Sequence, residues 1–189
     1  MKNFNYFLVC VIFIFFSCST SEKQEQTASM SSTEQQWDAN KKIAELGIEL
    51  PEVSPPVANF VHAVKTGNLI FLSGAGPKKA DGTFVNGKLG SDLTNEQGYE
   101  AARLAGIGHL AVLKSELGDL NKVKRIVNVL GMVNCDPEFK DQSAVVNGYS
   151  DLMVAVFGDK GKHTRAAVGM AGLPGGIAIE VTMIAEVAE

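Results

Sequence analysis

The chain has 189 residues, a length that fits one domain. Hydrophobic residues make up 46% and charged residues 20%, which supports a packed core. Seventeen basic and 21 acidic side chains give a net charge of −4, without the basic stripe of a nucleic-acid-binding protein, so we expect no nucleic-acid partner.

The first 18 residues, MKNFNYFLVCVIFIFFSC, have the features of an export signal. Lys2 gives a positive start, and Phe7 to Phe16 is an apolar run that is too short to span a bilayer as a helix. The end of this segment, Phe15 to Cys18, resembles a bacterial lipobox. Residues 1–18 are therefore predicted to be a lipoprotein-type signal peptide, with the exported protein anchored to the cell envelope by a lipid on Cys18. An ordinary secretory signal cut near Ser17, or an uncleaved anchor, is the alternative.

Two further regions follow the signal. Residues 19–33 are rich in Ser, Thr, Gln and Glu and predict a disordered tether. Residues 34–189 are expected to form the folded domain. Of the three cysteines only Cys135 lies there, so the domain can hold no internal disulfide, and Cys135 is interpreted as a small, partly buried residue at an element boundary.

The domain is expected to open with a helix and a hairpin. Trp37 to Leu46 predicts a short helix that begins near Thr33 or Glu34 and ends at Gly47. Two apolar runs, Asn59 to Val64 and Leu69 to Ser73, are separated by a Thr-Gly-Asn turn and predict a β-hairpin.

The strongest helix signal covers Thr94 to Leu117. Thr94 and Gln97 form a capping box, and Gly118 provides the stop. Several small residues recur at helical spacing, so we expect this face to pack closely on a sheet: Ala101, Leu104, Ala105, Gly108, Ala111 and Val112.

A β-branched strand and a second helix come next. Val123 to Asn134 predicts a long strand. Asp136 is expected to cap the following helix, with Pro137 in its first turn, and Gly158 to end it.

The last two strands are expected at Arg165 to Ala171 and Ile177 to Val187, joined by a turn at Leu173–Gly176. In the final strand one side is uniformly apolar, whereas the other carries Glu180 and Glu186 among apolar residues, which favours a subunit interface or a cleft. The element order is β-β-α-β-α-β-β. The fold class is therefore α+β, with helices on one face of a mixed sheet.

Several catalytic patterns are missing from the sequence. It contains no phosphate-binding Gly-x-x-x-x-Gly-Lys-[Ser/Thr] loop and no Gly-x-Ser-x-Gly nucleophile elbow. His62, His109 and His163 do not have the spacing of metal ligands, so we expect no metal site, and His109 is interpreted as structural.

The C-terminal motif resembles that of a known family. Arg165, Leu173-Pro174 and Glu180 follow one another at the spacing of the RidA/YjgF family of reactive-intermediate (imine/enamine) deaminases. The hairpin from Asn59 to Gly74 resembles that family's opening hairpin, and Phe139 to Asn147 its asparagine-bearing segment. The similarity runs from about Val57 to the C-terminus and is greatest to a subgroup with a helix before the hairpin and with His163-Thr164-Arg165 ahead of the final strands.

The resemblance implies a chorismate-mutase-like fold and a homotrimer with a central barrel and three clefts between subunits. Arg165 would bind the carboxylate of a small metabolite, and Glu180 would activate water, so these two are the candidate catalytic residues. The remaining candidate substrate-binding residues are Ser73, Gly74, Asn147, Phe60 and Ala167. The implied reaction is hydrolysis of 2-imino or enamino acids to 2-keto acids and ammonia, without a cofactor.

Three positions depart from the family pattern. Phe60 stands where the family has a tyrosine, Ala167 where it often has cysteine, and His62 where glutamine is common. The alternatives are a trimer that binds a small carboxylate without turnover and, with less support, an endoribonuclease. Arg165 could also form an interface ion pair with Glu180 or Glu186.

Overall fold

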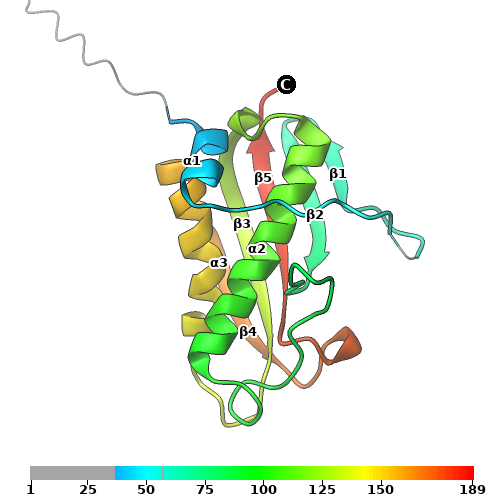
Figure 1. Ribbon diagram of the computed structural model, residues 1–189, viewed down its shortest axis with the longest axis vertical. Helices are drawn as coiled ribbons and strands as arrows, with labels where there is room; N and C mark the ends of the chain where they lie inside the picture. Colours follow the sequence, from blue (N-terminus) through cyan, green and yellow to red (C-terminus); the bar gives the residue numbers. More distant parts are fainter. Residues whose placement is uncertain (1–36, 57) are drawn as a thin grey trace, which may run out of the picture. The chain divides into compact units, whose positions relative to one another are not determined.

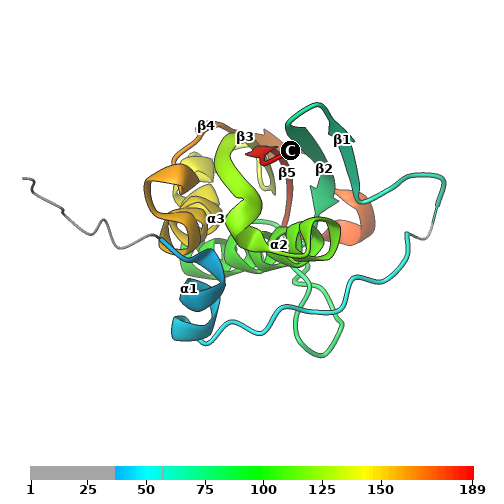
Figure 2. The same ribbon diagram turned by 90° about the horizontal axis from the view of Figure 1, so that it is seen from above.

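The computed structural model describes residues 37–56 and 58–189, so the predicted signal, lipobox and tether lie outside the described residues. Five strands form one sheet in the order β1-β2-β5-β3-β4. Their bounds are β1 (Ala63–Thr66), β2 (Leu69–Ala75), β3 (Val123–Asn134), β4 (Thr164–Met170) and β5 (Ile179–Val187). Strands β3 and β4 are parallel and the other pairs antiparallel. Helices α2 (Asn95–Leu117) and α3 (Gln142–Phe157) cover one face (Figures 1 and 2), which confirms the expected mixed-sheet fold.

The two faces of the sheet differ along β5. Ile179, Val181, Met183, Ala185 and Val187 are buried against the helices. The residues between them are only partly buried and lie on the side without helices, which we name the open face. Strand pairing places further apolar side chains on the open face, and three of them are well exposed: Val64 (55%), Phe71 (41%) and Val168 (38%).

Helix α2 begins and ends as expected, but part of its predicted face is wrong. Thr94 and Gln97 form the capping box, and Gly118 ends the helix with a φ of 73°. However, Leu104, Gly108 and Val112 are only partly buried, because the buried stripe includes Gly98, Ala102, Gly106 and His109 instead. The closest approach is to α3 rather than to the sheet, since a Cβ on Gly148 would overlap the carbonyl oxygen of Tyr99.

The starts of both other helices also differ from expectation. Helix α1 (Ala39–Glu45) begins after Asp38, whose carboxylate caps the amides of Asn40 and Lys41, and not near Thr33 or Glu34. Helix α3 begins at Gln142 rather than after Asp136. The backbone amide of Asp136 instead donates to the carbonyl oxygen of Leu89, and this long-range bridge keeps the segment around Asp136 extended.

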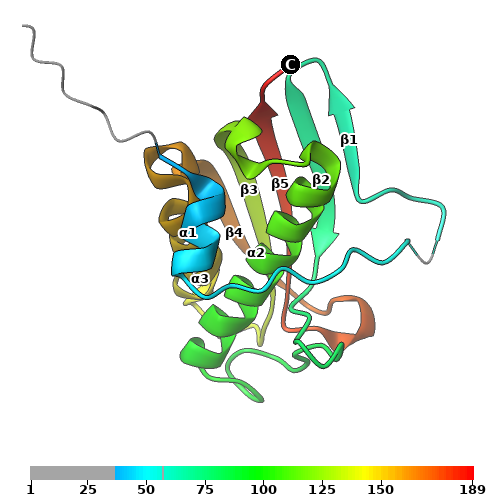
Figure 3. The same cartoon turned by 45° about the horizontal axis from the view of Figure 1, so that its top comes forward.

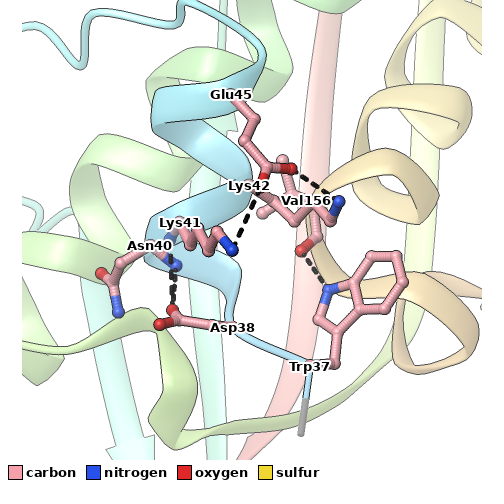
Figure 4. Close-up of polar contacts among 7 residues, drawn as sticks. All are labelled: Trp37, Asp38, Asn40, Lys41, Lys42, Glu45 and Val156. Carbon is pink, nitrogen blue, oxygen red and sulfur yellow. Dashed lines mark hydrogen bonds and ion pairs between the residues drawn. The ribbon is translucent and has the colours of Figure 1, made fainter. Parts of the chain in front are cut away.

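The segment before the sheet is tied to the helical layer. The indole N–H of Trp37 donates to the carbonyl oxygen of Val156 at 2.7 Å (Figure 4), and the ring lies over Gly158. From α1 the chain crosses over α2 as a strap, residues 48–56 (Figure 3), and then enters β1. The hairpin is confirmed, although β1 is shorter than predicted and begins at Ala63. Within the described residues, no helix is long and apolar enough to cross a membrane.

Candidate functional site

Arg165 lies on β4 and points toward α3. Its Nη1 donates to the Oδ1 of Asn147 at 2.8 Å and to the hydroxyl of Ser150 at 3.0 Å. Among residues 37–56 and 58–189, Nε and Nη2 have no hydrogen-bond partner and the side chain has no ion-pair partner. The guanidinium therefore keeps its charge and one edge with two parallel N–H donors, which matches the geometry of a carboxylate.

A histidine stands behind Ser150. The Nε2 of His163 lies 3.0 Å from the hydroxyl of Ser150, and its Nδ1 lies 2.6 Å from the carbonyl oxygen of Gly161. Burial lowers the pKa of His163, the bond to Gly161 opposes this shift, and the charge of Arg165 adds to it. The ring is consequently neutral at pH 7 and can accept a hydrogen bond.

Glu180 lies on β5 and projects from the open face over Gly74 of β2. A Cβ on Gly74 would overlap the carboxylate of Glu180, so only glycine leaves room for it there. A β-bulge between Leu72 and Ala75 gives β2 this local geometry. In the described part of the chain, Glu180 has no ion-pair partner. It borders a cavity of about 440 Å³, shared with Phe84, Asn86 and the Pro174 turn.

The residues before Gly74 line a second cavity, of about 430 Å³, between the strap and α2. The Ser73 hydroxyl donates to the carbonyl of Val61 at 2.7 Å, so it satisfies the backbone. Phe60 is 48% exposed, and its ring meets that of His62 edge-on. Phe60, Ser73 and Gly74 all border this largely apolar space.

A buried polar network holds β2 at this point. Burial lowers the pKa of His109 from 6.5 to about 4, so the ring is neutral at pH 7. The carbonyl oxygen of Ser73, 2.9 Å from Nε2, can only accept, so Nε2 carries the proton. Nδ1 then accepts from the Tyr149 hydroxyl at 2.7 Å. His109 is structural, as the sequence indicated.

The two candidate catalytic residues thus lie in separate clusters on opposite faces of the sheet. Arg165 pairs in register with Val129, which pairs with Met183, and both of these are buried on the helix side. Glu180 pairs with Met132 on the open face. Asn147 joins Arg165, and Ala167 lies on the same side of β4, whereas Gly74 joins Glu180. One small ligand cannot contact both clusters within a single chain.

Sequence reasoning selected Asn147, one partner of Arg165, but missed its other partner Ser150 and the partner of His109, Tyr149. Ser150 and Tyr149 lie among other polar residues of α3 and carry no local pattern that marks them. Cys135 is buried more fully than the sequence indicated. In the part of the chain that the structure describes, no group of three or more His, Cys, Asp or Glu side chains is arranged to hold a metal ion.

The fold and the motif residues correspond to a known family. The model of the family described as "YjgF/chorismate mutase-like, putative endoribonuclease" matches residues 40–187, which include all of α1 but its first residue, all five strands and both candidate clusters. This chain belongs to the YjgF/chorismate mutase-like family.

Relatives in this family are similar over most of the chain. Protein TCP17 of Trypanosoma cruzi is 42% identical over 145 residues, which are 76% of this chain and 91% of that protein. The crystal structure of a protein of unknown function from Agrobacterium tumefaciens is 38% identical, with a TM-score of 0.73, over 79% of this chain and 94% of that one. A structure described as a putative endoribonuclease from Shewanella oneidensis is 30% identical, with a TM-score of 0.76, over 79% and 99% of the two chains.

Proposed function

We propose that this protein hydrolyses small 2-imino or enamino acids to 2-keto acids and ammonia, in clefts between the subunits of a homotrimer. The observation that carries the proposal is that two charged side chains, Arg165 and Glu180, have no ion-pair partner in the described residues. Arg165 presents a free donor edge, and Glu180 lies over Gly74 without an ion-pair partner in the described residues. A carboxylate-bearing substrate and a water molecule are the chemical complements of these two groups.

In this mechanism Arg165 binds the substrate carboxylate and holds the imine carbon near Glu180. The Glu180 carboxylate takes a proton from water as the water oxygen attacks the C2 carbon, and the imine nitrogen takes up a proton. The protonated Glu180 then returns its proton to the amino nitrogen of the resulting carbinolamine, so the C–N bond breaks and ammonia leaves with the bonding pair, while the hydroxyl proton is released to solvent as the C2 carbonyl forms. The net reaction consumes one water and needs neither a redox partner nor a cofactor.

The trimer accounts for the separation of the two clusters. Because Arg165 and Glu180 lie on opposite faces of one sheet, a shared ligand requires Arg165 of one subunit and Glu180 of another. The open face supports such packing, since Val64, Phe71 and Val168 are exposed on it. β4 is an edge strand, which offers unpaired backbone groups to a neighbour.

The test uses the full-length chain and imines generated in situ by an amino-acid oxidase, with keto acid and ammonia as the measured products. Glu180→Gln should lower turnover by about 10²–10⁴-fold, whereas Glu186→Gln, on the same side of β5, should not. Arg165→Ala should weaken substrate affinity by about 2–5 kcal/mol, and Arg125→Ala should serve as its control. If the wild-type protein accelerates the hydrolysis of none of several imines, the proposed enzymatic function is refuted.

A carboxylate-binding trimer without turnover is the second candidate. Its supporting observation is Phe60, which brings no hydroxyl to the cavity beside Ser73. In that case Arg165→Ala would lose binding, whereas Glu180→Gln would change little. An endoribonuclease is less well supported, because the chain has a net charge of −4 and its sequence carries no basic stripe to bind RNA. RNA cleavage that survives Arg165→Ala and Glu180→Gln would separate that activity from this site.

We also propose that the protein acts outside the cytoplasm, anchored by a lipid on Cys18. The support is the sequence alone: an apolar run followed by a lipobox-like Phe-Phe-Ser-Cys. Metabolic labelling with a fatty acid should tag the wild-type chain but not Cys18→Ser. Unlabelled wild-type protein recovered without the membrane fraction would contradict the anchor.

A further inference from the structure

We propose that Ser150 and His163 are positioning residues that orient the Arg165 guanidinium for carboxylate binding. The inference rests on the proposed function, because it concerns the same ligand group. Ser150 is not among the positions that the family resemblance marks, and its contacts with Arg165 and His163 appear only in the folded chain.

The three side chains form a hydrogen-bonded relay with one possible direction. Arg165 can only donate, so Nη1 donates to the oxygen of Ser150 at 3.0 Å. The carbonyl of Gly161 can only accept, so the Nδ1 of His163, at 2.6 Å, carries the ring proton. In the neutral ring Nε2 is then an acceptor, and the Ser150 hydroxyl donates to it at 3.0 Å. The donor and the acceptor in each of these hydrogen bonds are therefore fixed.

This relay decides which edge of Arg165 is presented. Nη1 has two hydrogens, and Asn147 and Ser150 accept one each. The Nε–Nη2 edge therefore stays available, with its two N–H bonds parallel, for a bidentate carboxylate. Both acceptors are neutral, so the relay fixes the orientation of Arg165 without neutralising its charge.

The relay requires a neutral His163. Protonation would turn Nε2 into a donor, remove the acceptor for the Ser150 hydroxyl and place a second positive charge beside Arg165. Burial and the Arg165 charge both lower the pKa of His163. Of the other charged residues nearby in sequence, Asp159 pairs with Lys162, and Asp151 accepts from the hydroxyl of Tyr99.

The experiment compares Ser150→Ala, His163→Leu and His163→Gln in the full-length protein. Ser143→Ala, an exposed serine of the same helix, is the control. Pyruvate is the carboxylate probe. Ser150→Ala and His163→Leu should each raise the Kd for pyruvate and the KM for imines by about tenfold, with a smaller effect on kcat. His163→Gln keeps an acceptor for Ser150 and should remain close to the wild type.

A second measurement reads the orientation directly, without any ligand. NMR of the Arg165 guanidinium should show separate, slowly exchanging Nη signals in the wild type and averaged signals in Ser150→Ala. Unchanged signals and unchanged Kd in Ser150→Ala, or equal effects of His163→Leu and His163→Gln, would overturn the positioning role.

The outcomes separate this inference from the proposed function. If the Kd effects appear but imines are not hydrolysed, the positioning role stands and the proposed hydrolysis fails. If wild-type protein binds no pyruvate, both fail. Thermal unfolding of each variant shows whether a loss of binding reflects loss of the fold.

Discussion

Gly74 on β2 lies directly beneath the carboxylate of Glu180 on β5, so closely that a methyl group on Gly74 would occupy the space of that carboxylate. The two residues belong to adjacent antiparallel strands, at a bulge in their register. The position of the candidate general base is thus set by the absence of a side chain on the neighbouring strand.

Gly74→Ala should therefore lower activity while keeping the fold. The overlapping atoms belong to a flexible side chain, so Glu180 can rotate away at little cost in stability, but its carboxylate leaves the site. We expect imine hydrolysis to fall by at least about tenfold, with kcat affected more than KM. Gly172→Ala is the control, because nothing lies within 4 Å of its added methyl group. Equal activity of the two variants would contradict this arrangement.

Gly148→Ala should instead destabilise the protein. Its added methyl group would overlap the backbone carbonyl of Tyr99, which cannot move unless α2 and α3 separate. We expect a loss of about 1–3 kcal/mol in the free energy of unfolding, measured by urea denaturation. Gly108→Ala on α2, whose nearest neighbour would be 3.9 Å away, should raise stability by about 0.5–1 kcal/mol. A Gly148→Ala variant as stable as the wild type would show that the helices lie farther apart.

Stability should depend on pH through His109. Its pKa falls from 6.5 to about 4 on folding, because the ring is buried. Between these pH values the unfolded chain binds a proton that the folded chain does not. The free energy of unfolding should therefore decrease as pH falls from about 6.5 to about 4, by on the order of 3 kcal/mol, and this effect should level off below that.

His109→Gln tests this assignment. The variant should be less stable at pH 7.5, since the network with Ser73 and Tyr149 is disturbed, but its stability should fall less steeply on acidification. Urea unfolding at several pH values and one protein concentration measures both. If the free energy of unfolding of His109→Gln depends on pH as steeply as that of the wild type, other groups cause the dependence. His62→Gln is the control variant.

The charge of Arg165 should be visible in the titration of His163. NMR titration is expected to give His163 a pKa below 6.5, chiefly because the ring is partly buried, with a further lowering by Arg165. Arg165→Ala should raise this pKa without restoring the ordinary value, since the burial remains. Arg125→Ala should leave it unchanged. A pKa of His163 that stays the same or falls in Arg165→Ala would show that the two groups are not neighbours.

Much of the fold could be predicted because its boundaries have local signals. The bounds of β3 were predicted correctly, and the capping box and Gly118 fixed both ends of α2. The start of α3 was wrong because Asp136-Pro137 has the local form of a helix start, whereas the bridge to Leu89 that overrides it joins residues far apart in the chain. The prediction of which face of α2 is buried was partly wrong, because this helix packs most closely on α3 and not on the sheet.

The candidate site was predictable only in part. Arg165 and Glu180 could be selected because the family motif fixes their spacing. Their placement on opposite faces of the sheet depends on strand register, which emerges only when β5 is inserted between β2 and β3. The Ser150 relay could not be predicted, because a serine on a helix has no pattern that identifies an arginine 15 residues away as its partner.

Trp37 is the only tryptophan of the chain, and it lies at the junction of α1 and α3 with its indole bonded to Val156. The fluorescence of the unmodified protein therefore comes chiefly from one known place, on the helical layer and away from the open face. A red shift of the emission would report that the N-terminal helix has lifted from α3. Events on the open face can be followed with other probes while this native signal shows whether the rest of the subunit has stayed intact.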